Sequence, residues 1–201
     1  LSDDHIANVN YQKFVETFGE EGNLILLAVK DSTLFQPEQF KAWNALSDSI
    51  NNLPEVTATI SISDLKVLIK NKEKQAFELK SLIPQSELDQ EQITQLKNEL
   101  FDRLPFYDNL LYNSETQTIQ TAVYIRKDIV NSKLRKSLVF NKIIPAIDRF
   151  EQASKIDVRI SGMPYIRTLN SQNIVDEIGM FVGLALLVTA FIFFLFFRSW
   201  R

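Results

Sequence analysis

The chain has 201 residues, and its 22 basic and 25 acidic side chains give a formal net charge of −3. Because no basic stripe interleaved with aromatic residues occurs, nucleic acid is not an expected partner. The absence of cysteine excludes disulfides and thiolate metal sites, and it leaves the cellular compartment open.

The first third of the chain predicts helix, strand, helix and strand in succession. Apolar residues at helical spacing indicate a short helix before Gly22, and the continuously apolar residues 24–29 are typical of a strand buried on both faces. Residues 37–53 repeat apolar side chains in steps of three and four, which favours a helix. Residues 55–63 alternate as a strand does, so a βαβ unit with a right-handed crossover is expected. The predicted helical faces are Tyr11, Phe14, Val15 and Phe18, and then Phe40, Trp43, Leu46, Ile50 and Leu53.

The middle of the chain has a weaker pattern, followed by a helix and a hairpin. Residues 64–88 are polar with scattered apolar positions, and we predict a linker with helical fragments there. Asp89 is a candidate N-cap for a helix that runs to about Leu104. Apolar and alternating segments at 110–112 and 118–125 flank a polar turn, so a β-hairpin is expected.

A long helix and a short strand complete the folded part. Residues 132–154 predict a helix that Pro145 kinks, because proline removes one backbone hydrogen bond. Residues 156–160 alternate as a strand, which Gly162 and Pro164 end. The order of elements predicts an α+β fold with ferredoxin-like βαβ subdomains, whose helices lie on one face of small sheets. The expected inward residues of the long helix are Leu134, Leu138, Ile144, Ile147 and Phe150.

The last part of the chain predicts a membrane span. Residues 178–197 are twenty residues without a charge, and a helix of that length covers about 30 Å, the thickness of the hydrocarbon core of a bilayer. Acidic residues precede this stretch and arginines follow it, which predicts a cytoplasmic C-terminal end and an extracytoplasmic location for residues 1–175. Because no signal peptide is visible, an earlier span is expected upstream of Leu1. The flanking charges are Asp176, Glu177, Arg198 and Arg201.

Few residues have the pattern of a chemical site. His5 is the only histidine and is expected to be solvated rather than bound to a metal, and no catalytic motif occurs, so we expect neither an enzyme nor a cofactor. Phe40 and Trp43 either belong to the core or line a cleft for an apolar ligand. Gly179 and Gly183 form a G-x-x-x-G spacing, which allows another membrane helix to pack closely.

Four short motifs resemble sequences of one transporter superfamily. FVETFGEEGNLILLAV is similar to the segment between a first membrane span and the first strand, and LSDSINNLPEV to the turn into the second strand. VRISGMPYI is similar to the last strand before a second span, and FLFFRSWR to the end of that span. In their order along all 201 residues, they resemble the resistance–nodulation–division (RND) superfamily, in particular its MMPL-like exporters.

The resemblance implies a fragment of a proton-driven exporter of apolar or lipid-like substrates in the bacterial inner membrane. The implied partners are the bilayer, the remaining transmembrane helices and a second porter domain of the same multi-pass protein, and a homo-oligomer is left open. A coupling joint is expected at Gly162 and Pro164, whereas the proton-carrying residues belong to later spans. The implied organisation is a segment after a first span (1–23), a periplasmic porter domain (24–166), a coupling turn (167–177), a transmembrane helix (178–197) and a cytoplasmic end (198–201).

Two alternatives stay open beside the exporter. An extracytoplasmic sensor or ligand-binding domain of a membrane receptor has the same arrangement of domain and span, and a protein-translocase subunit belongs to the same superfamily. An exporter predicts further spans after Arg201, whereas a sensor predicts a signalling helix and a soluble domain.

Overall fold

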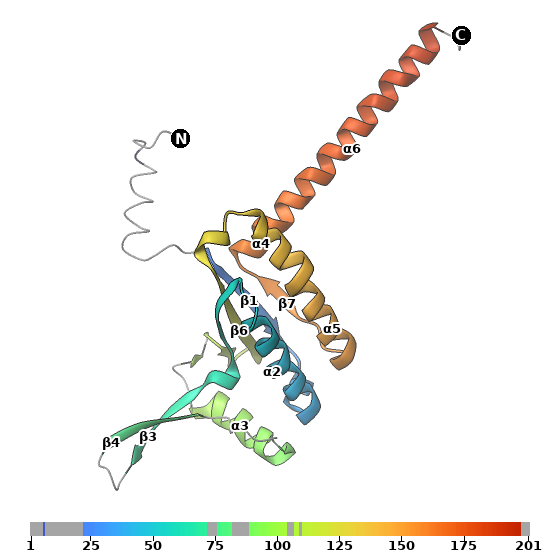
Figure 1. The fold of residues 1–201 in the computed structure, drawn as a ribbon. Coiled ribbons are helices and arrows are strands. Elements are labelled where there is room, and N and C mark those ends of the chain that lie inside the picture. Colours follow the sequence, from blue (N-terminus) through green and yellow to red (C-terminus); the bar gives the residue numbers. More distant parts are fainter. Residues whose placement is uncertain are drawn as a thin grey trace. The chain divides into compact units, whose positions relative to one another are not determined.

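The computed structural model (Figure 1) has two units, Leu1–Tyr165 and Ile166–Arg201, and each is described by itself. The predicted helix before Gly22 lies outside the described residues, as does Leu104. The described residues are 6, 22–71, 76–81, 89–103, 107–108 and 110–197.

A five-stranded antiparallel sheet forms the centre of the first unit. Its strands lie in the order β2-β6-β1-β7, with β5 paired to β6. Because β1 and β2 are both antiparallel to β6, they run parallel to each other with β6 between them, so the predicted βαβ unit holds no direct pairing of its two strands. The strands are β1 (Leu24–Val29), β2 (Val56–Ile60), β5 (Tyr112–Asn113), β6 (Thr118–Ile125) and β7 (Arg159–Ser161).

Helices α2 (Pro37–Asn51) and α5 (Ile144–Ser154) contact each other, and Figure 1 shows them side by side in front of the sheet. The proline that begins α2 lacks an N–H in the turn where that group has no helical partner. α3 (Gln90–Arg103) is capped as predicted: the Gln92 N–H donates to Asp89 Oδ1 (2.8 Å), and the Asp89 N–H donates to Gln92 Oε1 (3.0 Å).

One face of the sheet forms most of the hydrophobic core. Ile25, Leu27 and Val29 are at most 1% exposed, whereas Leu24 and Leu26, on the other face of β1, are half-buried. The prediction that this strand is buried on both faces is therefore wrong, because α2 and α5 lie on the same side of the sheet. In β6 the predicted inward residues Ile119, Thr121, Val123 and Ile125 are buried, and Ala122, on the other face, is buried as well.

The strict alternation predicted for residues 55–63 breaks within β2. The register of β2 against β6 shifts between Val56 and Ala58, and Ile60 is 41% exposed. An irregularity of this kind changes the face on which the following side chains lie. Ile62 is buried, but it belongs to the 3-10 turn η2 (Ile62–Asp64) rather than to the strand.

Residues 64–88 are not a linker with helical fragments where the structure describes them. β3 (Lys66–Asn71) and β4 (Ala76–Ser81) form a separate antiparallel pair. The prediction failed because hydrogen bonds between two strands need no alternating apolar pattern, and neither strand belongs to the central sheet.

The helix predicted over residues 132–154 consists of α4 (Lys133–Leu138), the π-helical turn η5 (Val139–Ile143) and α5. The wide turn precedes Pro145, which has no N–H to donate to the turn before it. An extra residue in this turn rotates the inward face, so Leu134 is 54% exposed and that part of the prediction is wrong. Leu138, Ile147 and Phe150 are buried as predicted.

Helix α6 (Met163–Phe197) has 35 residues; Met163–Tyr165 belong to the first unit, and the rest of α6 makes up the described part of the second unit. Residues 167–177, predicted as a turn, are helical, because they contain no glycine or proline that interrupts a helix. Within the described part of the chain, α6 is the one helix long and apolar enough to cross a membrane.

Candidate functional site

Three strands meet at the end of the sheet from which the chain passes into α6. β1 begins at this end, and β6 and β7 finish there, because Leu24 pairs with Tyr124 and Leu26 pairs with Ser161. This part of the first unit is termed the junction end. It contains both residues of the predicted coupling joint, Gly162 and Pro164.

Gly162 joins β7 to α6 at a point with no room for a side chain. Its φ angle is +113°, which strains any other residue. A Cβ on this residue would lie 2.2 Å from the Leu24 carbonyl oxygen and 3.0 Å from the Ile25 Cα. The start of β1 and the β7–α6 connection therefore meet backbone to backbone. Pro164 is buried in the first turn of α6, where a missing N–H leaves no helical hydrogen bond unmade.

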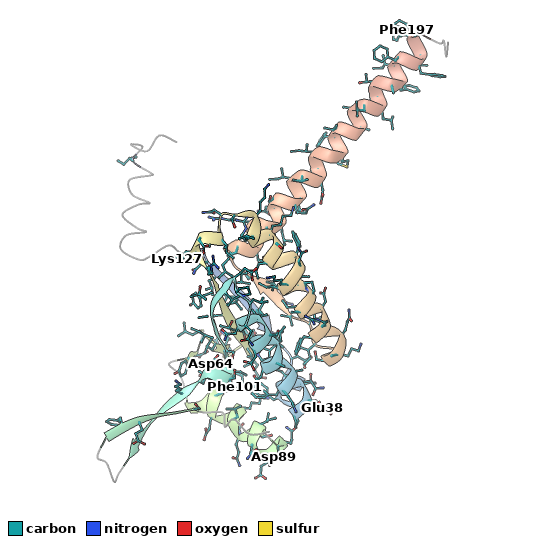
Figure 2. The ribbon with its side chains drawn as sticks, viewed as in Figure 1. Glu38, Asp64, Asp89, Phe101, Lys127 and Phe197 are labelled. Carbon is teal, nitrogen blue, oxygen red and sulfur yellow. The ribbon has the colours of Figure 1, made fainter. Side chains whose placement is uncertain are left out.

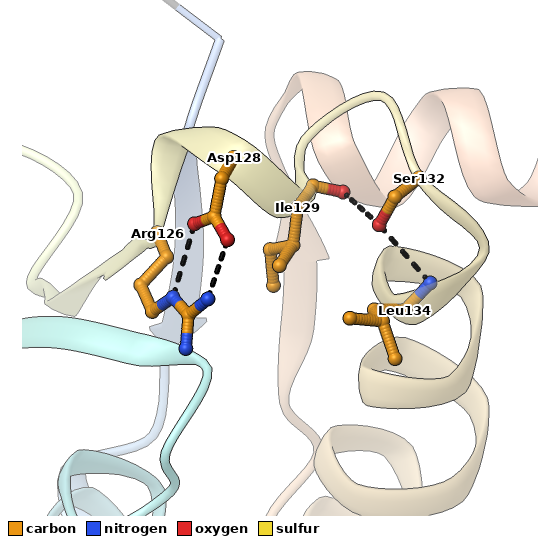
Figure 3. Close-up of polar contacts among 5 residues, drawn as sticks. All are labelled: Arg126, Asp128, Ile129, Ser132 and Leu134. Atoms are coloured by element: carbon orange, nitrogen blue, oxygen red, sulfur yellow. Dashed lines mark hydrogen bonds and ion pairs between the residues drawn. The ribbon is translucent and has the colours of Figure 1, made fainter.

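The 3-10 turn η4 (Lys127–Ile129) leaves the end of β6 and is bonded to its surroundings. The Arg126 backbone N–H donates to the Glu55 carbonyl oxygen (2.8 Å). The Arg126 guanidinium donates to both carboxylate oxygens of Asp128, from Nε to Oδ1 at 3.0 Å and from Nη2 to Oδ2 (Figure 3). These hydrogen bonds lower the pKa of the Asp128 carboxyl, so this residue stays charged at neutral pH.

Hydrogen bonds also hold the connection from η4 to α4. The Leu134 N–H donates to Ser132 Oγ (3.1 Å), and this hydroxyl donates to the Ile129 carbonyl oxygen (3.0 Å), as Figure 3 shows. Ser132 is thus the N-cap of α4. Arg135 Nη1 donates to the Val130 carbonyl oxygen. These bonds fix the backbone that carries the exposed Leu134 side chain.

An ion pair joins the turn before β2 to the π-helical turn η5. Lys142 Nζ lies 2.5 Å from Glu55 Oε1, and the two side chains are 35% and 17% exposed. The hydrogen bond from Lys142 lowers the pKa of the Glu55 carboxyl, although burial opposes the shift. Glu55 Oε2 is buried without a hydrogen-bond partner among the described residues, so the Glu55 carboxylate depends on Lys142 for its pairing.

Residues 126–136, with the sequence RKDIVNSKLRK, concentrate positive charge at the junction end. They include five basic residues and one acidic residue, in a chain whose formal net charge is −3. This segment is termed the basic shoulder. This segment is not among the predicted site residues, although its basic residues are visible in the sequence, because the strand register is what places it beside the β7–α6 connection. Its exposed lysines are Lys127, Lys133 and Lys136.

The other predicted site residues lie in the core and in α6. Phe40 is 2% exposed and Trp43 is 0% exposed. The Trp43 and Phe150 rings pack edge to face, with 5.5 Å between their centroids. Of their two interpretations, the structure supports the core, and the lining of a cleft stays a prediction. Gly179 and Gly183 are four residues apart on α6, and no described atom outside the local helix backbone would lie within 4 Å of a Cβ on either. Their role in helix packing stays a prediction.

The surface of α6 from Ile178 to Phe197 is apolar on all sides (Figure 2). Its large apolar side chains are 47–81% exposed. The Thr189 hydroxyl donates to the Ala185 carbonyl oxygen (2.8 Å), so this polar side chain is satisfied within the helix. A helix whose polar groups are all bonded internally suits hydrocarbon rather than water.

No group of three or more potential metal ligands occurs among the described residues. No model of a known protein family and no curated protein matches this chain.

Proposed function

We propose that this chain is part of a membrane protein in which residues 178–197 span the bilayer. The apolar surface of α6 carries the proposal, because about 30 Å of helix exposes large apolar side chains and leaves its one side-chain hydroxyl bonded to its own backbone. The acidic residues before this stretch and the arginines after it favour a cytoplasmic C-terminal end. The first unit then lies on the extracytoplasmic side of a bacterial inner membrane.

The first unit is proposed to be a ferredoxin-like subdomain. Two features support this assignment: the strand order β2-β6-β1-β7, and the arrangement in which a helix connects β1 to β2 and further helices connect β6 to β7. β1 and β2 are parallel to each other with β6 between them, and β6 and β7 are parallel to each other with β1 between them. Such interleaved βαβ halves are typical of that fold.

The whole protein is proposed to be a proton-driven exporter of the RND superfamily, of the MMPL-like branch, that moves apolar or lipid-like substrates. The four motifs, in their order along the chain, support this proposal, and VRISGMP coincides with β7 and the start of α6. The first unit would form part of the substrate path with a second porter domain, and other transmembrane helices would carry the protons.

In this exporter, the junction end transmits movement between α6 and the sheet. The backbone contact between Gly162 and Leu24 leaves no side chain that could absorb a displacement, so a shift of the first turn of α6 reaches β1 directly. The Glu55–Lys142 pair and the hydrogen bond from the Arg126 N–H to the Glu55 carbonyl oxygen tie η5 and the end of β6 to the turn before β2. The coupling between α6 and the sheet depends on this backbone contact between Gly162 and Leu24.

A sensor or ligand-binding domain of a membrane receptor is the second candidate. The continuity of α6 favours it, because an unbroken helix from Met163 into the apolar stretch also transmits a ligand-induced change. A sensor would respond to its ligand without a proton gradient, whereas an exporter would stop when the gradient is removed.

Cysteine labelling tests the membrane orientation, since the chain contains no cysteine of its own. Glu115→Cys, in the exposed turn between β5 and β6, is expected to react with a membrane-impermeant maleimide added to intact spheroplasts. Labelling only after lysis would refute the orientation. In cells that carry the whole protein, protonophore-sensitive efflux of a fluorescent lipid-like dye supports the exporter, and efflux equal to that of cells without the protein refutes it.

A further inference from the structure

The basic shoulder, residues 126–136, contains five basic residues and one acidic residue, and its three lysines are exposed. Lys133 is the first residue of α4, whereas Arg135 and Lys136 lie in its last turn. A cation at the N-terminal end of a helix opposes the helix dipole and costs stability. The position of Lys133 therefore breaks a local rule, which indicates a functional reason for this residue.

An exposed apolar side chain lies among these charges. Leu134 is 54% exposed, and its neighbours in sequence are Lys133 and Arg135. The Ser132 cap and the bond from Arg135 to Val130 hold the backbone at this position. Basic residues around an exposed leucine are typical of segments that lie at the boundary between lipid headgroups and acyl chains.

The run of basic residues that forms the shoulder lies at the junction end of the first unit. Figure 2 places Lys127 at the junction end, and it places Glu38, Asp64 and Asp89 at the opposite end. A negatively charged surface therefore attracts this run of basic residues. The attracted end is the one from which the chain continues into the apolar helix.

We propose that the basic shoulder docks on anionic phospholipid headgroups of the same bilayer that α6 spans. Lys127, Lys133 and Lys136 bind the headgroup phosphates, and Leu134 contacts the acyl boundary. This inference rests on the proposed function in one respect, which is that residues 178–197 span the membrane. Charge complementarity and the position beside the start of α6 favour lipid over an acidic protein as the occupant.

The length of α6 sets the distance over which the attraction must act. The helical residues from Met163 to Glu177 place the junction end at most about 22 Å from the uncharged stretch. The headgroup layer occupies about 5–7 Å of this distance. The remaining gap of at most about 15 Å lies within the Debye length of about 30 Å at 0.01 M salt, whereas at 1 M the Debye length is only about 3 Å. Docking is therefore expected to depend strongly on salt.

The test uses the full chain in lipid nanodiscs of phosphatidylcholine, with or without phosphatidylglycerol. A fluorophore on Asn131→Cys, in the exposed connection before α4, reports its contact with a quencher attached to lipid headgroups. Stronger quenching is expected in the anionic discs at low salt, and this difference should disappear near 1 M salt. The same fluorophore on Glu115→Cys, in the β5–β6 turn, should show no difference between the two discs.

Matched charge variants complete the test. Lys127→Gln, Lys133→Gln and Lys136→Gln together remove three charges, each worth about a fivefold change in the ratio of docked to undocked molecules, so quenching should fall to the level of neutral discs. The control triple Lys30→Gln, Lys41→Gln and Lys66→Gln removes as many exposed charges outside the shoulder and should leave the quenching unchanged.

Three results overturn the docking proposal: equal quenching in neutral and anionic discs, an unchanged response in the shoulder triple, or an equal response from the Glu115→Cys probe. Equal quenching combined with salt-sensitive self-association of the chain would assign the shoulder to an acidic protein surface instead. Failure of the chain to enter neutral discs refutes the membrane span itself, so the two proposals fail by different observations.

Discussion

The replacement Gly162→Ala tests the backbone contact on which the junction end depends. The added Cβ would lie 2.2 Å from the Leu24 carbonyl oxygen, which is far inside van der Waals contact. An alanine at a φ of +113° costs about 1–3 kcal/mol. Relief of the overlap, by moving β7 from β1, costs about 1–3 kcal/mol more. We expect the free energy of unfolding to fall by roughly 4 kcal/mol, out of about 5–15 kcal/mol for a domain of ordinary stability.

Urea unfolding of the full chain in detergent measures this loss. Trp43 is fully buried and reports the folding of the first unit in a Trp200→Phe background. With a slope of about 2 kcal/mol per M urea, the midpoint should fall by about 2 M. The control is Gly179→Ala, where the new Cβ meets no described atom outside the local helix backbone, and its midpoint should not fall. A Gly162→Ala midpoint equal to that of the unmodified chain would refute the reasoning.

Further predictions concern the coupling joint, the ion pair, the helix cap and the core. Pro164→Ala should leave the urea midpoint within about 0.5 M but reduce export, and normal export in this variant would contradict the coupling role. Lys142→Met should destabilise the fold by about 1–3 kcal/mol because it leaves the Glu55 carboxylate unpaired. The lowered pKa of Glu55 means that the pair stabilises the fold above the ordinary value of 4.5 and that this contribution is lost as the pH falls through the folded pKa. Urea titrations of Lys142→Met should therefore show a smaller loss of stability below pH 4.5 than the unmodified chain does, and an equal loss would contradict the assignment. Ser132→Ala should cost about 1 kcal/mol and speed amide hydrogen exchange at Leu134, and unchanged exchange would count against the cap. The Trp43 Nε1 has no partner among the described residues, so Trp43→Phe should cost much less than the roughly 3–5 kcal/mol of Trp43→Ala, and equal losses by urea unfolding would contradict this.

The pattern of neighbouring residues was sufficient to predict several of the helices and strands. The predicted helix over residues 37–53 corresponds to α2, and the Asp89 cap of α3 is confirmed, because both signals depend on residues within one or two turns. The bounds of β1 and β6 agree with their apolar and alternating patterns. The apolar stretch at 178–197 lies within a helix for the same local reason.

The predictions that failed depended on residues distant in sequence. β3 and β4 exist because they pair with each other; β3 has no apolar alternation, and the alternation of β4 covers only the four residues 77–80. Leu134 is exposed because the π-helical turn after it changes which residues face the sheet. The face of Ile60 depends on the register shift of β2 against β6, which the sequence of β2 alone does not contain.

The pairing of an α+β unit with an apolar helix of membrane-spanning length follows from the amino-acid sequence alone, because helix periodicity and an uncharged run are properties of neighbouring residues. The sequence also marked Gly162 as the end of the last strand. The strand order, the contact of the Leu24 carbonyl with Gly162 and the position of the basic shoulder at the same end of the sheet become visible in the folded chain and not in its sequence. Strand pairing satisfies backbone groups far apart in the chain, so its result appears when the whole sheet has formed.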